Sequence, residues 1–297
     1  MNVKEIVKWC FSFILGFHPK YRHKIVLFMD GGICSQMKVY VIGRLFEERG
    51  DDVYYDISAI ENGGKDCDNV FARNFDLLKL YPTINFKKIE SVQRGFWVKY
   101  LKFSHRYAAD FKYLDIMAPR YMAGYYEMPD SVYKSIKKYF PQPANIESKY
   151  VDKISNCKYS CGVHVRRGDL KYGNPFYGAA ASPQYFINAI DVIHKSYPTV
   201  KFFFFSDELE YVKKEILPYC ADIEYECVEG NGSDRGYVDL YLLMMCNFQI
   251  SSCGSFGKFA ALFNEKEPRA LVLMDTPESK LWKGRFDGKV IIVNDTE

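Results

Sequence analysis

The stretch YSCGVHVRRGD, from Tyr159 to Asp169, joins a short apolar run to a polar end that carries two adjacent arginines. The run YSCGVHV (159–165) is typical of a strand, and KFFFFS (201–206), further along the chain, of a strand buried on both faces of a parallel sheet. The polar residues after YSCGVHV then lie at the carboxyl end of that strand. Because open parallel sheets bind ligands at this end, the stretch predicts both a fold class and the place of a site.

The segments that follow alternate between strand and helix patterns. Strands are predicted at 201–206 (KFFFFS), 223–228 (IEYECV), 248–252 (FQISS) and 269–274 (RALVLM), with helices at 183–195, 207–217, 238–246 and 255–264. Ser182 and Pro183 form the N-cap and first-turn pair of the first of these helices. Strict alternation predicts a doubly wound α/β fold with a parallel sheet and right-handed crossovers.

The N-terminal half begins with a similar unit. The run KIVLFM (24–29) predicts a strand, DGGICSQM supplies a glycine turn at Gly31 and Gly32, and a helix is expected from Gln36 to Arg49, followed by a strand in DVYYDIS. This is a βαβ unit. Residues 72–148 show only aromatic, partly helical segments.

The length of the chain predicts two domains. A chain of 297 residues exceeds what one hydrophobic core usually serves. The segment PQPANIES (141–148) has the composition of a linker. We therefore expect an N-terminal domain at 1–148 and a C-terminal domain at 149–297.

The charge and cysteine content of the chain indicate which binding partners and which cellular compartment to expect. The net charge of +3 gives no argument for nucleic-acid binding. The nine cysteines include no CxxC pair, and Cys157 and Cys161 lack the companion ligands of a zinc site. Free thiols in a reducing compartment are the simplest account, which predicts a cytoplasmic protein.

The N-terminus contains an apolar run from Trp9 to Phe17. The run is about half of the ~20 residues that a membrane-spanning helix needs, and no small-residue cleavage site follows it. We expect a helix that packs on the protein or, alternatively, lies on a membrane surface between Lys8 and the basic segment 20–24.

Three polar clusters are predicted to meet at one edge of the C-terminal sheet. Arg166 and Arg167 follow one strand, Ser206 to Glu208 follow the next, and Ser251 to Gly257 lie at a later strand-to-helix junction. Guanidinium groups match phosphate oxygens with two parallel hydrogen bonds, and a helix N-terminus adds amide donors and the positive end of a dipole. The alternative is an ion-pair cluster in which one arginine pairs with a nearby carboxylate.

The motifs HVRRGD, FFSDE and YVDLYLLMMCNFQISSCGSFGKFAALFN, in that order, resemble the successive motifs of the bacterial and animal α-1,2-fucosyltransferases. GGICSQM resembles the glycine-rich segment that opens that family. The resemblance spans about 30–264 and hardly covers 71–148. It implies two Rossmann-like domains facing a cleft, the GT-B type of fold.

The resemblance also implies an activity: an inverting transfer of L-fucose from GDP-β-L-fucose to the 2-hydroxyl of a terminal galactose in an oligosaccharide, without a metal or cofactor. The C-terminal domain would bind the donor and the N-terminal domain would shape the acceptor side. It implies a cytoplasmic enzyme of polysaccharide biosynthesis, peripheral on the inner membrane if the N-terminal helix touches lipid.

Site residues are assigned by the same resemblance. Arg166 and Arg167 would contact the diphosphate, and His164 and Asp169 would brace their loop. Asp207 would accept hydrogen bonds from the guanine or ribose. The remaining substrate-binding residues implied are Gly31, Gly32, Gln36, Ser206, Ser255 and Phe256.

The sequence departs from the family at two places. Cys34 and Ser35 stand where the family usually has Gly-Asn, and CGSFGKF (253–259) stands where it has NSSFSWW. These changes bear on the choice of acceptor and on the linkage. They also suggest an alternative, a nucleotide-sugar-binding protein without turnover.

Two further questions stay open in the sequence. Inversion needs a general base, for which Asp169, His164 and Asp30 are candidates. The segment DCD, with Asp66 and Asp68, matches the pattern of metal-dependent glycosyltransferases, in which two carboxylates hold Mn²⁺ or Mg²⁺ on the donor diphosphate. A metal-dependent glycosyltransferase is therefore the second alternative.

Overall fold

The computed structural model describes the chain except for residues 1–2, 66–71, 111–116, 172–178, 221 and 296–297. The chain divides into two compact units: unit 1 is Met1–Pro129 with Lys138–Gln142, and unit 2 is Asp130–Lys137 with Pro143–Glu297. The last crossing, at 142/143, falls inside the predicted linker 141–148. The two earlier crossings, at 129/130 and 137/138, form an excursion that composition does not predict.

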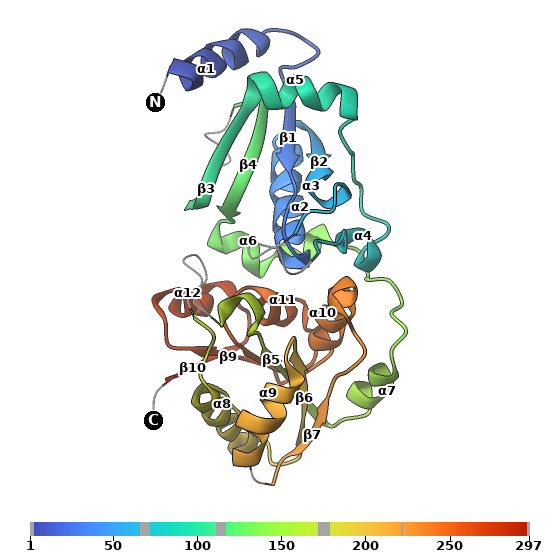
Figure 1. Ribbon diagram of the computed structural model, residues 1–297, viewed down its shortest axis with the longest axis vertical. Helices are drawn as coiled ribbons and strands as arrows, with labels where there is room; N and C mark the ends of the chain where they lie inside the picture. Colours follow the sequence, from blue (N-terminus) through green and yellow to red (C-terminus); the bar gives the residue numbers. More distant parts are fainter. Residues whose placement is uncertain (1–2, 66–71, 111–116, 172–178, 221, 296–297) are drawn as a thin grey trace. The chain divides into compact units, whose positions relative to one another are not determined.

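Unit 1 contains a four-stranded parallel sheet in the order β2-β1-β4-β3 (Figure 1). Its elements are α1 (Val3–Leu15), β1 (Lys24–Phe28), α2 (Ile33–Glu48), β2 (Asp52–Asp56), α3 (Ser58–Glu61), α4 (Leu77–Leu80), α5 (Ser91–Leu101), β3 (Lys102–Asp110) and β4 (Arg120–Glu127). The predicted βαβ unit is β1, α2 and β2. Strands β3 and β4 lie in the segment for which the sequence indicates only aromatic, partly helical structure.

Apolar side chains explain how the helices of unit 1 pack. Helix α2 contacts β1, β2 and β4. Helix α5 covers a cluster in which Trp97 and Leu101 pack with Val26 of β1 and Tyr121 of β4. Helix α1 packs on α5, and within the described residues no helix is long and apolar enough to cross a membrane.

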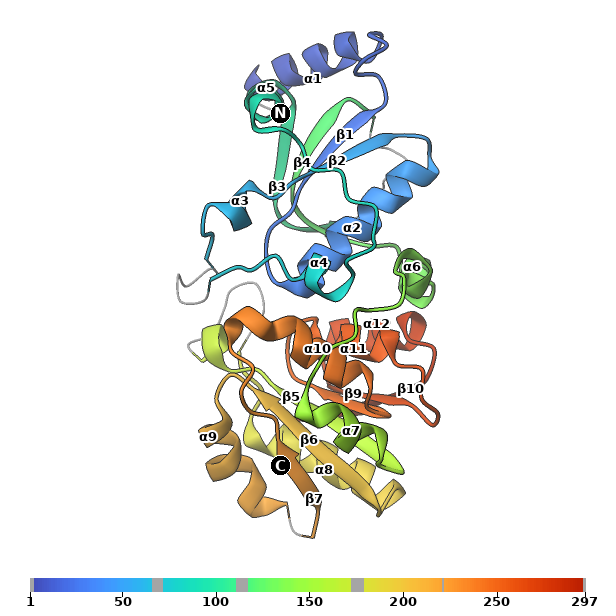
Figure 2. The same cartoon turned by 90° about the vertical axis from the view of Figure 1, so that its right-hand side faces the viewer.

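Unit 2 contains a six-stranded parallel sheet in the order β10-β9-β8-β5-β6-β7 (Figure 2). Its helices and strands are α6 (Asp130–Lys134), α7 (Lys149–Ser155), β5 (Tyr159–Val165), α8 (Pro183–Ser196), β6 (Val200–Ser206), α9 (Leu209–Tyr211), β7 (Glu224–Cys227), α10 (Gly236–Met244), β8 (Phe248–Ser251), α11 (Phe256–Phe263), β9 (Ala270–Met274), α12 (Pro277–Arg285) and β10 (Lys289–Val293). A π-helical turn (Val212–Ile216) and a 3-10 turn (Leu217–Tyr219) continue α9. All the strands predicted in this half are present, and β10 is an additional one.

Two sequence features explain how helices of unit 2 begin and how they pack on its sheet. The predicted cap of α8 is present, since the Ser182 side chain accepts a hydrogen bond from the amide of Tyr185. Gly162 in β5 lies so close to α10 that a Cβ atom there would be 2.5 Å from Leu243 Cδ2. Aromatic and aliphatic side chains of β5, β6, β8 and α8 form the core.

Candidate active site at the carboxyl ends of the unit 2 sheet

The order of strands in unit 2 places a topological switch point between β5 and β8. From β5 the chain continues outward to β6 and β7, then returns to add β8, β9 and β10 on the other side of β5. Parallel sheets of this order bind ligands at the switch point, outside the carboxyl ends of the strands. Arg166 follows β5 and Ser252 follows β8 at this point. The predicted convergence of polar segments at one edge is confirmed.

Arg166 lies on the β8 side of the switch point. Its amide donates to Ser252 Oγ at 3.1 Å, and the Ser252 amide donates to the His164 carbonyl at 3.2 Å. Gly254 has a φ of +92°, and a Cβ atom at this residue would be 3.0 Å from Arg166 Nη1. Glycine is therefore required for the loop after β8 to pass beside the guanidinium.

Arg167 lies on the β6 side. Its amide donates to Asp207 Oδ1 at 3.0 Å, its guanidinium Cζ is 3.5 Å from the ring centre of Tyr211, and its Nε is 3.5 Å from Glu208 Oε2. Ser206 Oγ accepts a hydrogen bond from the Glu208 amide at 3.0 Å. The two arginines thus face opposite sides of the end of β5, and the guanidinium of Arg167 lies near the carboxylate of Glu208.

His164 is packed under the first residue of α11. Its ring stacks on Phe256 with centroids 4.9 Å apart, and its Nδ1 atom is buried without a hydrogen-bond partner among the described atoms. Burial, followed by the charge of Arg166, lowers the pKa of His164 to about 3. The imidazole is therefore neutral at neutral pH and a weak base.

The N-terminus of α11 points its first turn toward the same edge. Ser255 is the N-cap residue, and its side chain makes no capping hydrogen bond. A Cβ atom at Gly257 would be 2.8 Å from Ser251 Oγ, so the helix begins in direct contact with the end of β8. Asp169 lies in a 3-10 turn (Gly168–Leu170), and its side chain is outside the described part of the structure.

Two residues near this edge, Tyr211 and Asp239, were missed by sequence reasoning, and Glu208 was placed in a predicted cluster without a role. Tyr211 packs on the guanidinium of Arg167, and Glu208 pairs with Lys171 at 2.5 Å and lies 3.5 Å from Arg167 Nε. Asp239, in the first turn of α10, accepts a hydrogen bond of 2.7 Å from Asn231 Nδ2, and burial raises its pKa to about 6. The available signal for Asp239 was a single carboxylate inside the apolar run YVDLYLLMM.

The predicted glycine turn in unit 1 follows β1. Gly31 has a φ of +85°, and its amide donates to Asp30 Oδ1 at 2.5 Å. Gly32 is the N-cap residue of α2. Gln36 is fully buried, and its Nε2 atom donates to the carbonyls of Gly31 and Asn74.

The carbonyl end of Gln36 is engaged as well. Its Oε1 atom accepts hydrogen bonds from the amides of Asp76 and Leu77 at 3.1 and 3.0 Å. Both amide hydrogens and the oxygen of Gln36 therefore bind backbone groups. This residue fixes the glycine turn against the start of α4.

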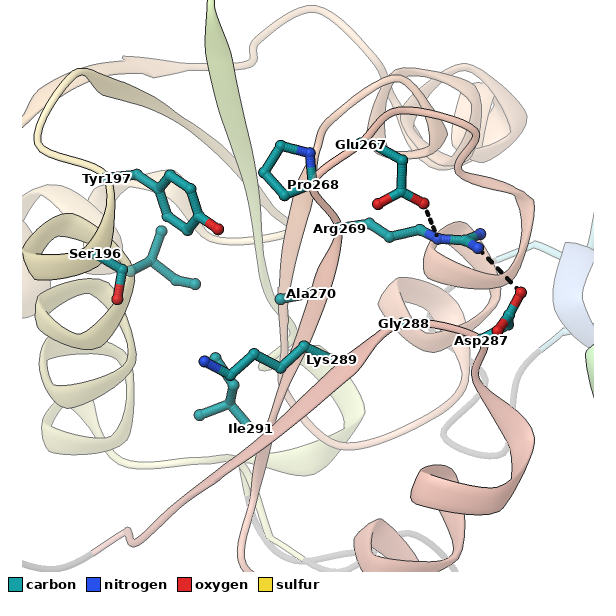
Figure 3. Close-up of a pocket in the computed structure, with 11 residues that line it drawn as sticks. Ser196, Tyr197, Glu267, Pro268, Arg269, Ala270, Asp287, Gly288, Lys289 and Ile291 are labelled. Carbon is teal, nitrogen blue, oxygen red and sulfur yellow. Dashed lines mark hydrogen bonds and ion pairs between the residues drawn. The ribbon is translucent and has the colours of Figure 1, made fainter.

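A surface pocket of about 430 Å³ lies at the amino ends of β9 and β10, the opposite edge of the unit 2 sheet (Figure 3). Its arginine, Arg269, is paired with Glu267 at 2.9 Å and with Asp287 at 3.1 Å. Two carboxylates neutralise this guanidinium, so the pocket is not a match for phosphate. Among the described residues no group of three or more His, Cys, Asp or Glu is arranged to hold a metal ion, and Asp66 and Asp68 lie outside the described residues.

Comparisons with known structures concern the fold. The chain is similar to crystal structures of POFUT1 in complex with GDP (TM-score 0.52, 13% identity) and with GDP-fucose (TM-score 0.51, 12% identity). The match covers 84% of this chain in both cases, and 98% and 97% of those chains. The expected α/β architecture of GT-B type, with parallel sheets, is confirmed.

Curated relatives match over a shorter stretch. The chain is 28% identical over 127 residues to an α-1,2-colitosyltransferase of Escherichia coli, which covers 41% of this chain and 42% of that protein. It is 31% identical over 121 residues to the galactoside 2-α-L-fucosyltransferase Sec1 of Mus musculus, covering 40% and 32%. A bovine galactoside α-(1,2)-fucosyltransferase 2 matches at 31% identity over 128 residues, covering 41% and 36%. The matched stretch therefore spans about a third to two fifths of each of these relatives.

A family model extends the match across most of the chain. The model of glycosyl transferase family 11 matches residues 74–289, which includes the switch point of unit 2 and both flanking loops. The chain belongs to glycosyl transferase family 11, the α-1,2-fucosyltransferase family.

Proposed function

We propose that this protein is an inverting glycosyltransferase that moves L-fucose from GDP-β-L-fucose to the 2-hydroxyl of a terminal galactose, with no metal ion. One observation carries the proposal: in a chain of glycosyl transferase family 11, Arg166 stands at the switch point beside the N-terminus of α11. Unit 2 binds the donor nucleotide sugar in this proposal, and unit 1 recognises the acceptor.

The chemistry of the departing group explains why a cation is needed there. As the glycosidic bond lengthens, negative charge builds on the β-phosphate of GDP. A preorganised guanidinium and helix amides stabilise that charge more in the transition state than in the ground state. Arg166 takes this role, together with the first amides of α11.

Arg167 has a different position in the proposal. Its guanidinium is already held by Tyr211 and Glu208, and its amide binds Asp207. It therefore shapes the edge beside β6, where Asp207 accepts hydrogen bonds from the ribose or the base, and it adds positive potential to the diphosphate.

The general base is a carboxylate in this proposal. A base works best when its pKa lies near the working pH, and a pKa of about 3 leaves His164 poorly suited to accept a proton. His164 instead packs Phe256 against the loop. Asp169 and Asp30 are the remaining bases predicted from the sequence.

The identity of the sugar on the donor nucleotide also has to be tested. The matched Escherichia coli relative is named a colitosyltransferase. A diphosphate site of arginine and helix amides recognises the GDP part alone, so GDP-colitose is the second donor to test beside GDP-fucose.

The decisive assay uses GDP-fucose or GDP-colitose with a β-galactoside acceptor, with and without EDTA. We expect turnover with GDP-fucose that EDTA leaves unchanged, and a product with an α-1,2 linkage by NMR. Loss of turnover in EDTA, restored by Mn²⁺, contradicts the metal-free assignment and favours the alternative with Asp66 and Asp68. GDP binding without transfer from either donor favours the non-catalytic alternative.

Variants of one arginine sharpen the assay. Arg166→Lys keeps a charge but cannot make the planar two-pronged contact, so kcat should fall on the order of 10²–10³-fold, about 3–4 kcal/mol. The matched control is Arg269→Lys, at the opposite edge of the same sheet, which should keep the full rate. Near-normal turnover in Arg166→Lys contradicts the diphosphate assignment.

A further inference from the structure

We propose that the outer face of α1 binds an anionic phospholipid surface. This inference goes beyond the glycosyl transfer proposed above and does not depend on it. Helix α1 is too short to span a bilayer, since it has 13 residues and a span needs about 20. It is long enough to lie in the headgroup region with one face in the acyl chains.

The inner face of α1 is held on unit 1 by specific contacts. Ser12 is the one buried residue of the helix, and its Oγ atom donates to the Pro119 carbonyl at 2.5 Å. Lys8 Nζ donates to the Lys102 carbonyl at 3.1 Å, and the Phe11 ring lies 5.3 Å from that of Tyr100. These contacts fix which side of the helix faces outward.

The outer face is apolar along its whole length. In Figures 1 and 2, α1 lies across the outside of α5, and no other described element of unit 1 covers it. The large apolar side chains on this side are 44% to 75% exposed: Val3, Ile6, Val7, Trp9, Phe13, Ile14 and Phe17. Their spacing of three and four residues gathers them into one stripe, continued by the exposed Cys10. A stripe of this extent marks an interaction surface rather than ordinary surface.

The charged residues beside the apolar stripe indicate that its binding partner is an anionic lipid surface. Residues 3–24 contain five lysines and arginines and a single acidic residue, Glu5. Lys4 is exposed in the first turn, and Lys20 and Arg22 are exposed just after the helix. Cations at both ends of an apolar face lie at the level of lipid headgroups and attract anionic lipids. A purely apolar protein partner would not require them.

One tryptophan makes the proposal directly measurable. Of the three tryptophans, Trp9 is 46% exposed, whereas Trp97 and Trp282 are 3% and 2% exposed. The chain of residues 1–297 is titrated with vesicles of phosphatidylcholine alone or with phosphatidylglycerol added. We expect a blue shift of the emission and quenching by brominated acyl chains with the anionic vesicles, weakened by salt. Trp9→Phe should remove the shift while leaving co-sedimentation.

Substitutions on the stripe test which surface binds. Ile14→Glu and Phe17→Glu, at residues 65% and 74% exposed, should each lower the vesicle partition coefficient on the order of tenfold. The matched control is Leu281→Glu on α12, 48% exposed in unit 2, which should bind as the parent does. Thermal melting checks that all three fold.

Three results would overturn the proposal. The first is no co-sedimentation and no emission change with anionic vesicles. The second is equal binding to neutral vesicles at low and high salt, which removes the role of the cations. The third is a dimer in sedimentation velocity that Ile14→Glu dissociates while vesicles are not bound, because the stripe would then be a contact between copies of the chain.

Discussion

Arg166 and Arg167, at the end of β5, show that two residues of the same type and adjacent in sequence can have different roles. The sequence treats Arg166 and Arg167 as one pair, because both carry the same donors. They follow β5 directly, and Arg167 is the N-cap residue of the turn Gly168–Leu170, so the structure places one beside Gly254 and the other over Tyr211. The backbone geometry therefore gives two chemically identical side chains different partners.

Asp239 gives a prediction about pH and stability. Burial raises its pKa from 3.8 to about 6, so the folded protein binds this proton more tightly than the unfolded chain does. The contribution of this proton to the free energy of unfolding is greatest below pH about 4, and it is lost as the pH rises through about 6. Above that, Asp239→Asn should raise the free energy of unfolding by about 1–3 kcal/mol.

Urea unfolding at pH 7.5 and pH 4 measures this difference, which should vanish at the lower pH. Asp191→Asn is the control, because Asp191 is an exposed carboxylate paired with Lys195. A less stable Asp239→Asn protein at pH 7.5 would show that the charged carboxylate supports the fold.

At the scale of elements, one glutamine links two helices of unit 1. Gln36 of α2 satisfies the amides of Asp76 and Leu77, where α4 begins. Removing it leaves buried backbone groups without partners, so Gln36→Ala should lower the free energy of unfolding by about 2–4 kcal/mol. Gln93→Ala on the exposed side of α5 should change it by no more than about 0.5 kcal/mol. Equal stability of the two variants would show that the hydrogen bonds of Gln36 add nothing measurable to the stability of the fold.

The strands of unit 2 were predictable because most of them are short, mainly apolar runs between turn residues, and β7 (Glu224–Cys227) alternates charged and apolar positions. Strands β3 and β4 gave no such signal. Lys102–Asp110 mixes charged and aromatic residues, and α5 ends at Leu101 where β3 begins at Lys102, with no glycine or proline between them. Where a helix passes into a strand without a turn residue, the spacing of apolar residues is the remaining signal in the sequence. The nine residues of β3 alternate too irregularly to show the two-residue spacing of a strand. Strand β10 had a readable signal, VIIV after Asp287 and Gly288, which the prediction did not use.

At the scale of the whole molecule, α6 belongs to unit 2 although it precedes the linker. Asp130 pairs with Arg285 at 2.7 Å, and Tyr133 packs on Trp282 with ring centroids 5.5 Å apart. Local composition cannot predict such an excursion, because both partners lie about half the chain away.

Two fragments test this division. A fragment 130–297 should be more stable by about 2–4 kcal/mol than a fragment 149–297, which loses α6 and uncovers Trp282. Trp282 is the single tryptophan of either fragment, so a red-shifted emission in the shorter one reports the exposure. Identical melting curves and emission would show that α6 adds nothing to unit 2.

The edge of the site was predictable from the sequence, whereas its inner contacts were not. The carboxyl-end rule needs only the order of strands and helices, and it placed Arg166, Asp207 and Ser255 on one edge. The contacts of the two arginines with Glu208, Tyr211 and Ser252 depend on the direction in which individual side chains point. That direction depends on packing between segments distant in the sequence.

Ser252, in the loop after β8, makes two hydrogen bonds to the end of β5 and the residue after it: its hydroxyl accepts from the Arg166 amide, and its amide donates to the His164 carbonyl. These two bonds tie the loop after β8 both to the end of β5 and to the loop that follows it, so a displacement of one loop is expected to shift the other. In the function proposed above, a nucleotide product that leaves past one of these loops is therefore expected to disturb the other loop as well.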